Sequence, residues 1–223
     1  LALAHRCGGN PLVLLLVTDP IRELFGGVVA AFLKVSDTFF SDIGQVLAQQ
    51  WDRSTALEQA ILYWLAIGRE LLLLNTVVAL LGETVPQREV LVALESLRRR
   101  MLIERGLDRP AFTLQPVILE YVTDRLVAAV HRELMTERPQ LVRSHALVQA
   151  TAKDYVRHSQ EQLIATPLLE RVAKTYGNAD VLERRLLDLL NGWRGQPHQV
   201  QGYGPGNVVN LLRMLRGHLR ELD

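Results

Sequence analysis

Apolar residues recur three or four positions apart along most of the chain, a spacing typical of helices that bury one face. Short polar, glycine-containing or proline-containing stretches interrupt this pattern and predict the helix ends. We predict helices over residues 11–18, 21–24, 28–33, 41–52, 55–65, 73–81, 88–100, 116–130, 141–158, 160–176, 181–193 and 208–222. The chain is therefore expected to be mostly helical.

The helix predicted over residues 55–65 has a clear start signal. Thr55 and Glu58 have the Thr-x-x-Glu spacing of a capping box, in which each side chain bonds a backbone amide that the first helical turn leaves unpaired. Leu57, Ile61 and Leu65 then recur at helical spacing. We expect this face to point into the core.

The hydrophobic period changes from helix to strand after residue 100. Residues 102–105 and 111–114 flank a five-residue segment, 106–110, that contains glycine and proline. This arrangement predicts a β-hairpin. Three short helices followed by a hairpin indicate a winged helix-turn-helix, so the fold expected is a helical segment, a winged helix with a short hairpin, and a second helical domain.

Glycine and proline also mark a possible domain boundary near the end of the chain. Residues 195–206 contain six of them and are the best linker candidate. We expect four regions: a helical segment over residues 1–48, a winged helix over 49–136, a helical domain over 137–200, and a linker with a helix over 201–223. The chain begins with Leu1, and we expect it to be an excerpt of a longer protein.

Composition and charge limit the kinds of partner and site that we expect. The net charge is +1, which creates no field that would demand nucleic acid or an anionic membrane. Cys7 is the only cysteine, so neither a disulfide framework nor a thiolate metal site is expected, and a cytoplasmic location fits. The histidines lack the paired spacing of metal ligands. The apolar run at residues 12–17 is too short to cross a bilayer, and no signal peptide is expected.

Three stretches together carry a family resemblance. They are residues 7–12 (CGGNPL), the helix 91–97 running into 102–104, and residues 112–122 (FTLQPVILEYV). In combination they resemble the C-terminal half of the NB-ARC module of STAND signalling ATPases, as found in bacterial proteins with WD40 or pentapeptide repeats. The first stretch resembles the family's CGGxPL motif, and the third occupies the place of its MHD or LHP segment. The last 22 residues look like the lead-in to repeat domains.

The resemblance implies a role for the first stretch in binding adenine. Pro11 would pack against the base, and Gly9 and Leu12 would shape the wall beside it. A proline ring offers a rigid apolar face, and glycine lets a backbone approach closely. The alternative interpretation of Gly9, Asn10 and Pro11 is a helix-start turn with no ligand.

The third stretch departs from the family at its phosphate contact. In the family, the MHD histidine touches the diphosphate end of ADP. Gln115 holds the matching position here, and Pro116 replaces the aspartate. An amide donates a hydrogen bond but carries no charge to a phosphate. Gln115 is therefore either a phosphate contact or a surface or capping amide.

The chain lacks the phosphate chemistry of an ATPase. A Gly-x-x-x-x-Gly-Lys-Ser/Thr loop, the Walker A motif, is missing, and so is a strand ending in paired acidic residues, the Walker B motif. We therefore predict no enzyme activity and no catalytic or metal site in this chain. This chain would bind ADP or ATP together with a P-loop domain encoded elsewhere in the same ATPase.

The resemblance predicts a switch element. The winged helix would close over ADP and swing away when ATP replaces it. The expected partners are the P-loop domain and a C-terminal repeat domain of the same protein. Oligomerisation on activation is also expected. No membrane partner is expected.

A DNA-binding winged-helix regulator is the alternative, because Arg98, Arg99 and Arg100 end the third helix. Those arginines also suit the negative end of the helix dipole, and Glu89 and Glu95 oppose a DNA contact, so we expect none. A protein-interaction scaffold without either ligand is a third possibility.

Overall fold

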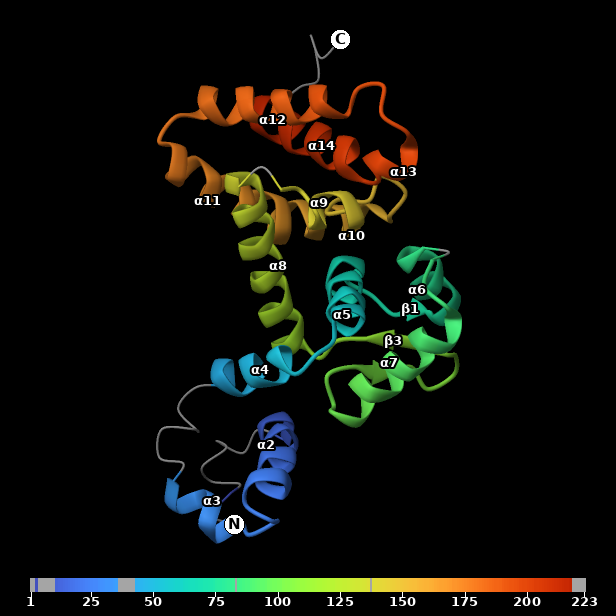
Figure 1. The fold of residues 1–223 in the computed structure, drawn as a ribbon, viewed down its shortest axis with the longest axis vertical. Coiled ribbons are helices and arrows are strands. Elements are labelled where there is room, and N and C mark those ends of the chain that lie inside the picture. Colours follow the sequence, from blue (N-terminus) through green and yellow to red (C-terminus); the bar gives the residue numbers. More distant parts are fainter. Residues whose placement is uncertain (1–2, 4–10, 36–42, 83, 137, 218–223) are drawn as a thin grey trace. The chain divides into compact units, whose positions relative to one another are not determined.

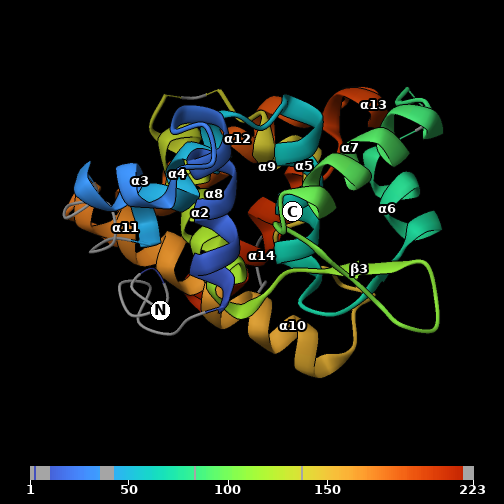
Figure 2. The ribbon, with the colours of Figure 1, turned by 90° about the horizontal axis from the view of Figure 1, so that it is seen from below.

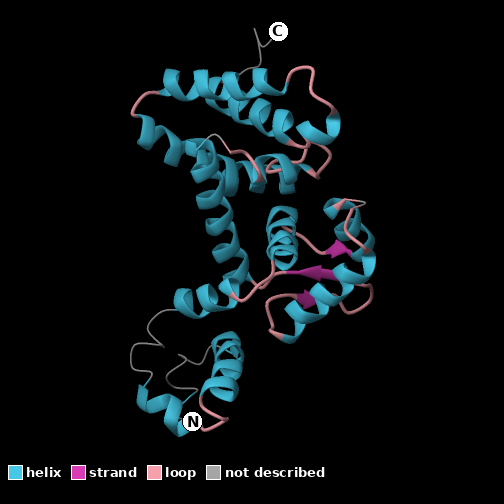
Figure 3. Ribbon diagram, viewed as in Figure 1, coloured by secondary structure: helices cyan, strands magenta, loops and turns pink. Residues whose placement is uncertain are grey.

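The computed structural model describes residues 3, 11–35, 43–82, 84–136 and 138–217. Over these residues the protein is mostly helical, with a small three-stranded antiparallel sheet (Figure 1, Figure 3). The predicted fold class is confirmed. The chain divides into two compact units: unit 1 is Leu1–Leu65 with Leu71–Tyr121, and unit 2 is Ala66–Glu70 with Val122–Asp223.

Unit 1 contains the N-terminal helices and the sheet. Its described elements are α2 (Pro11–Leu24), α3 (Val29–Val35), α4 (Ile43–Asp52), α5 (Ala56–Gly68) up to Leu65, β1 (Leu72–Leu73), α6 (Leu74–Leu81), α7 (Gln87–Arg99), β2 (Glu104–Arg105), β3 (Ala111–Thr113) and the start of α8 (Pro116–Thr136).

The winged helix consists of α5, β1, α6, α7, β2 and β3 in that order. The strand order in the sheet is β1-β3-β2, and both pairings are antiparallel. Leu72 lies opposite Phe112, and Glu104 lies opposite Thr113. The predicted hairpin is present, and β3 leads away from the loop that joins it to β2 (Figure 2).

Strand β1 is an element of unit 1 that sequence reasoning missed. Leu73 was predicted as the first residue of a helix, but it belongs to β1, and α6 begins at Leu74. A two-residue strand has no hydrophobic period of its own, so its identity depends on the partner strand β3. The backbone amide of Leu74 donates to the carbonyl of Pro110, 2.8 Å away, which continues the contact beyond the strand.

Helix α2 also differs from its prediction. The helix was expected to stop before Asp19 and Pro20, but it continues to Leu24. A proline inside a helix removes one backbone hydrogen bond and crowds the preceding turn. Val17 and Ile21 lie one turn apart on either side of this point and are both buried, which offsets that cost.

Unit 2 is a helical domain. Beyond the segment Ala66–Glu70 and the rest of α8, it contains α9 (Leu141–Ser144), α10 (Asp154–Gln160), the π-helix η1 (Glu161–Ala165), α11 (Thr166–Tyr176), α12 (Ala179–Trp193), α13 (His198–Gln201) and α14 (Gly204–Arg216). In Figure 1, α12 and α14 run alongside each other, and their residues contact one another extensively.

Two predictions fail within unit 2. The helix expected over residues 141–158 is split into α9 and α10, with irregular backbone between them. The predicted linker 195–206 instead holds α13 and the first turn of α14. The reason is local packing: Gly204, a linker-like residue by composition, is buried within unit 2, and so is Asn207 just after the predicted linker.

Gly204 allows α14 to approach α12. A Cβ atom at this position would lie 2.7 to 2.9 Å from three ring atoms of Trp193. Such distances are shorter than van der Waals contact, so only glycine fits against the indole without a shift. Gly206, two residues later in the same helix turn, has open space at its Cβ position.

Asn207 ties α14 to α9 and to the irregular segment after it. Its side-chain oxygen accepts from the amide of Leu147 at 2.8 Å, and its amide nitrogen donates to the carbonyls of Val142 and His145 at 2.7 Å. Asn207 is 3% exposed. One side chain thus satisfies three backbone groups that no helix or strand pairs.

We predict that Gly204→Ala destabilises the protein by about 1–3 kcal/mol, because the added methyl group overpacks the contact with Trp193. Gly206→Ala is the matched control and should be neutral or stabilising by up to about 1 kcal/mol, since alanine favours the helix. Urea unfolding followed by circular dichroism measures both. Equal midpoints for the two variants would contradict this account of α14 packing.

Replacing Asn207 by alanine should cost about 2–4 kcal/mol, because three buried backbone groups lose their partner. Asn210→Ala provides the comparison, since Asn210 makes one long contact of 3.4 Å to the carbonyl of Val148 and should lose less than about 1 kcal/mol. The same unfolding measurement applies. A loss at Asn207 no larger than at Asn210 would show that its hydrogen bonds do not stabilise unit 2.

Candidate functional site

Gln115 lies at the junction between the wing and the long helix α8. It follows β3 and directly precedes Pro116, and its carbonyl accepts from the amide of Leu119 at 2.8 Å. Its neighbours Leu114 and Ile118 are buried, so the backbone of the junction is held firmly in unit 1. The side chain is half-buried.

The side chain of Gln115 bonds to the wing. Its Nε2 donates to Oε1 of Glu104, which lies in β2, at 2.8 Å. The interaction therefore links the first wing strand to the start of α8. The side-chain amide of Gln115, the predicted phosphate contact, lies at the junction and donates its hydrogen bond to the carboxylate of Glu104.

The other predicted ligand residues are Gly9, Pro11 and Leu12. Gly9 lies outside the described residues. Pro11 and Leu12 are the first two residues of α2, and their side chains also lie outside the described part. The structure therefore gives no side-chain contact for the proposed adenine wall, and this role stays a prediction.

The three arginines that end α7 have different partners. Arg98 donates from Nε and Nη2 to the two carboxylate oxygens of Glu95 at 3.0 Å, and Arg99 donates to Glu95 at 3.3 Å. The hydrogen bond from Arg98 lowers the pKa of Glu95, and the charges of Arg98 and Arg99 lower it further. Both arginines are exposed, whereas Arg100 turns inward.

Arg100 joins three helices. Its Nη2 lies 3.0 Å from Oε1 of Glu58 and 3.2 Å from Oγ of Ser54, and its Nη1 donates to the carbonyl of Gln50 at 3.2 Å. The side chains of Arg100 and Glu58 are 16% and 6% exposed. We call these four residues the Arg100 network.

The Arg100 network is continuous with the predicted capping box, which is confirmed. The amide of Thr55 donates to Oε2 of Glu58 at 2.8 Å, and the amide of Glu58 donates to Oγ1 of Thr55 at 3.2 Å. Glu58 therefore caps α5 with one carboxylate oxygen and binds Arg100 with the other. The end of α4, the start of α5 and the end of α7 are fastened at one point.

Sequence reasoning treated the three arginines alike and missed this network, although a signal was available. Arg100 lies three positions after Leu97 and seven after Ala93, which places it on the buried face of α7. Gln50 lies three positions after Leu47 and four after Val46, on the buried face of α4. A polar residue on an apolar helix face predicts a buried partner.

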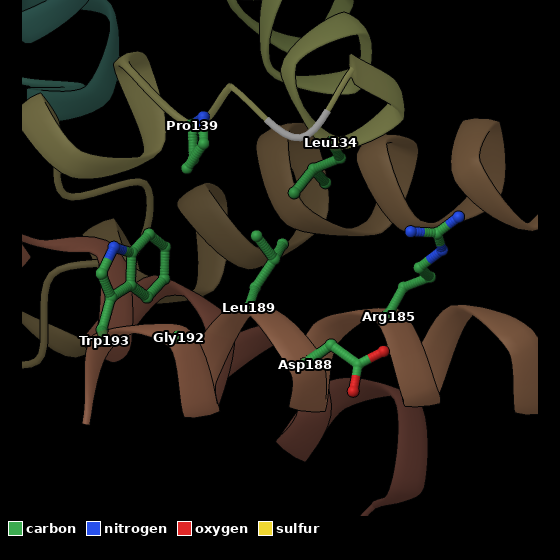
Figure 4. A pocket seen from close by; sticks show the side chains of 7 residues that line it. All are labelled: Leu134, Pro139, Arg185, Asp188, Leu189, Gly192 and Trp193. Atoms are coloured by element: carbon green, nitrogen blue, oxygen red, sulfur yellow. The ribbon is translucent and has the colours of Figure 1, made fainter.

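Unit 2 holds a separate cavity of about 360 Å³ (Figure 4). Trp193 lies at one end, Arg185 and Asp188 lie at the other, and Leu134 and Leu189 lie between them. The cavity was not predicted, because its walls come from helices that are far apart in sequence.

Metal chemistry finds no support in the part of the chain that the structure describes. No group of three or more potential ligand side chains gathers there. Within the same residues, no helix is long and apolar enough to cross a membrane.

Comparison with known proteins finds a curated relative. An uncharacterized WD repeat-containing protein of Nostoc sp. strain PCC 7120 is 39% identical to this chain over 257 aligned residues. The match covers 99% of this chain and 20% of the relative, so the chain spans about a fifth of the relative's length. No family model matches the chain, and no solved structure matches it. The chain is thus similar to one stretch of a WD repeat-containing protein.

We predict that Arg100→Gln destabilises unit 1 by about 3 kcal/mol, because it leaves the carboxylate of Glu58 buried without its counter-charge. Arg98→Gln removes the same charge from the exposed end of the same helix and should change stability far less, because water screens the ion pair of Arg98 with Glu95. Thermal and urea unfolding compare the two. Equal stability of the variants would exclude the Arg100 network as a structural anchor.

Proposed function

We propose that this chain is the regulatory segment of a STAND-type signalling ATPase. In this proposal, the start of α2 forms a wall beside the adenine of ADP or ATP, and the winged helix is a lid over the nucleotide. The phosphates would be held by a P-loop domain elsewhere in the protein. The observation that carries the proposal is the order of parts in unit 1: a helix starting at Pro11, a winged helix, and Gln115 at the strand-to-helix junction.

The chemistry of Pro11 and Gln115 suits this role. Pro11 begins α2, where a proline costs no helical hydrogen bond, and in this proposal its rigid apolar ring would pack against a flat base. Gln115 carries an amide donor on a firmly held junction. A wall and a lid on the same unit bind a nucleotide together only when the unit is closed, and this supplies the differential contact that a switch requires.

The contact between Gln115 and Glu104 suggests how the lid responds to phosphate. A phosphate brought close to Gln115 would repel the Glu104 carboxylate, which is exposed and free to turn toward water. The amide would then donate to the phosphate instead. Because the amide of Gln115 is neutral, it would give the phosphate a hydrogen bond but no positive charge. The lid would therefore hold its nucleotide less firmly than a lid with a charged donor at this position.

The WD repeat-containing relative supports a repeat domain in the same protein. In our proposal, that domain senses a signal and biases the closed and open states, with oligomerisation on activation and a cytoplasmic location. The contacts of Arg98 and Arg99 favour this role over DNA binding, because both guanidiniums would have to leave Glu95 to reach a phosphate backbone.

Substituting Pro11 by glutamate in the full-length protein should lower ADP affinity by roughly tenfold or more, because a carboxylate replaces an apolar face at the base. Dissociation of fluorescent ADP, measured by stopped flow, reports the change. Pro86→Glu is the control, since Pro86 is exposed before α7 and far in sequence from the wall. Unchanged ADP affinity in the Pro11 variant would falsify its role as a wall.

A further inference from the structure

Unit 2 holds a ligand site that is separate from the predicted nucleotide wall and lid. It is the cavity of about 360 Å³ that α12 forms with the end of α8 and with Pro139 (Figure 4). Its size lies in the range of cavities that bind small molecules. We propose that it binds a small organic amine, with the ammonium group at Asp188 and an apolar ring beside Trp193.

The apolar part of the cavity is the first argument. Leu189 and Trp193 lie on α12, and Leu134 and Pro139 lie on the opposite side (Figure 4). Trp193 is 7% exposed, and its ring packs directly against the backbone of Gly204, which leaves no room for a Cβ atom there. The indole is therefore a wall in a fixed position, and such a wall suits an apolar ring.

The open space at Gly192 is the second argument. Gly192 lies on the same face of α12 as Arg185 and Leu189, at helical spacing from both, and all three line the cavity. A Cβ atom at Gly192 would meet no other atom within 4 Å, so packing does not require a glycine here. Glycine is also less favourable than alanine inside a helix. A ligand that occupies the space explains why no side chain fills it.

The third argument is the charge of Asp188. The charged residues that line the cavity are Arg185 and Asp188. Arg185 already has a partner of its own. The side chain of Asp188, in contrast, forms no hydrogen bond or ion pair with any residue that the structure describes. An ammonium group would give this carboxylate a charge-assisted hydrogen bond, so the cavity favours a cation over an anion.

The spacing of Asp188 and Trp193 sets the length of the ligand. The two residues are five positions apart on α12, which corresponds to about 7.5 Å along the helix axis. An aromatic ring joined to an ammonium group by a short carbon chain bridges such a distance. The binding involves unit 2 alone and does not depend on the proposed nucleotide switch.

The test titrates the 223-residue chain with phenethylamine and follows the side-chain indole signals by heteronuclear NMR. The chain has three tryptophans, and the spectrum of Trp193→Phe identifies the Trp193 signal by its loss. We expect this signal to shift saturably, with a dissociation constant on the order of 1 mM. The signals of Trp51 and Trp64 should stay in place. A Trp193 signal that does not move would overturn the proposal.

Two further probes with the same ring separate charge recognition from apolar binding. Phenethyl alcohol is neutral, and phenylacetate is negatively charged. Phenethylamine should bind about fivefold more tightly than the alcohol, because it pairs with Asp188, and phenylacetate should bind most weakly. Equal binding of all three would mean that only the apolar wall recognises them. Tighter binding of phenylacetate would assign recognition to Arg185, and either result would overturn the proposal.

Variants of α12 locate the ammonium group. Asp188→Asn should remove the preference for the amine over the alcohol. Asp180→Asn is the matched control, because it removes the same charge from an exposed residue of the same helix that does not line the cavity, and the preference should remain. Equal effects of the two substitutions would contradict the assignment to Asp188.

A variant that fills the cavity tests its location. Gly192→Leu should abolish binding of both the amine and the alcohol, because the added side chain occupies the open space. It should not lower the urea midpoint of unfolding, since leucine favours the helix. Undiminished binding would show that the ligand lies elsewhere. Because no nucleotide is present, these outcomes are independent of the ADP experiment.

Discussion

The winged helix depends on the burial of one charged side chain, Arg100. A guanidinium group removed from water needs partners for its charge and its N–H donors, and the protein provides Glu58, Ser54 and the carbonyl of Gln50. These partners belong to the end of α4 and the start of α5. Their positions are therefore coupled to the end of α7, and a shift of any one of these helices breaks the network.

The same anchor sets the position of the wing. Met101, which follows Arg100, adopts a positive φ of 56°, and the amide of Leu102 donates back to the carbonyl of Leu97 at 3.0 Å. The chain thus reverses directly after the anchor and enters β2 at Glu104. A non-glycine residue in this conformation is strained, and the buried contacts on either side hold it there.

The charged groups of unit 1 have separate roles as a consequence. Arg98 and Arg99 stay outside with Glu95, while Arg100 is held in the network. Glu104 at the wing holds the amide of Gln115. In the proposed switch, the anchor is the fixed part, and the junction at Gln115 is the part whose hydrogen bond is exchanged.

The sequence predicted what depends on local pattern. The capping box at Thr55 and Glu58, the hairpin, and the third helix of the winged helix follow from spacing and period. Contacts between distant segments were not predictable in the same way. Strand β1 exists only because β3 pairs with it, and α14 packs because Gly204 meets Trp193. Composition predicted a linker there, since glycine serves both flexible linkers and close contacts.

In the candidate site, too, the local pattern was predictable and the contacts between distant segments were not. The resemblance indicated Gln115, and the junction at which it lies is held by buried neighbours. The partner of Gln115, Glu104, lies eleven positions earlier in the chain and becomes its neighbour only through the hairpin register. Arg100 was classed with its two neighbours, because a run of like charges conceals the one member that the helix turns inward.

Hydrogen–deuterium exchange on the full-length protein tests the central claim, that unit 1 closes over a nucleotide, most directly. With ADP bound, the account predicts slower amide exchange in two segments together, the start of α2 and residues 104–119, and faster exchange in both when a non-hydrolysable ATP analogue replaces ADP. Exchange that is the same with ADP, with the ATP analogue and without nucleotide in these two segments would contradict the claim.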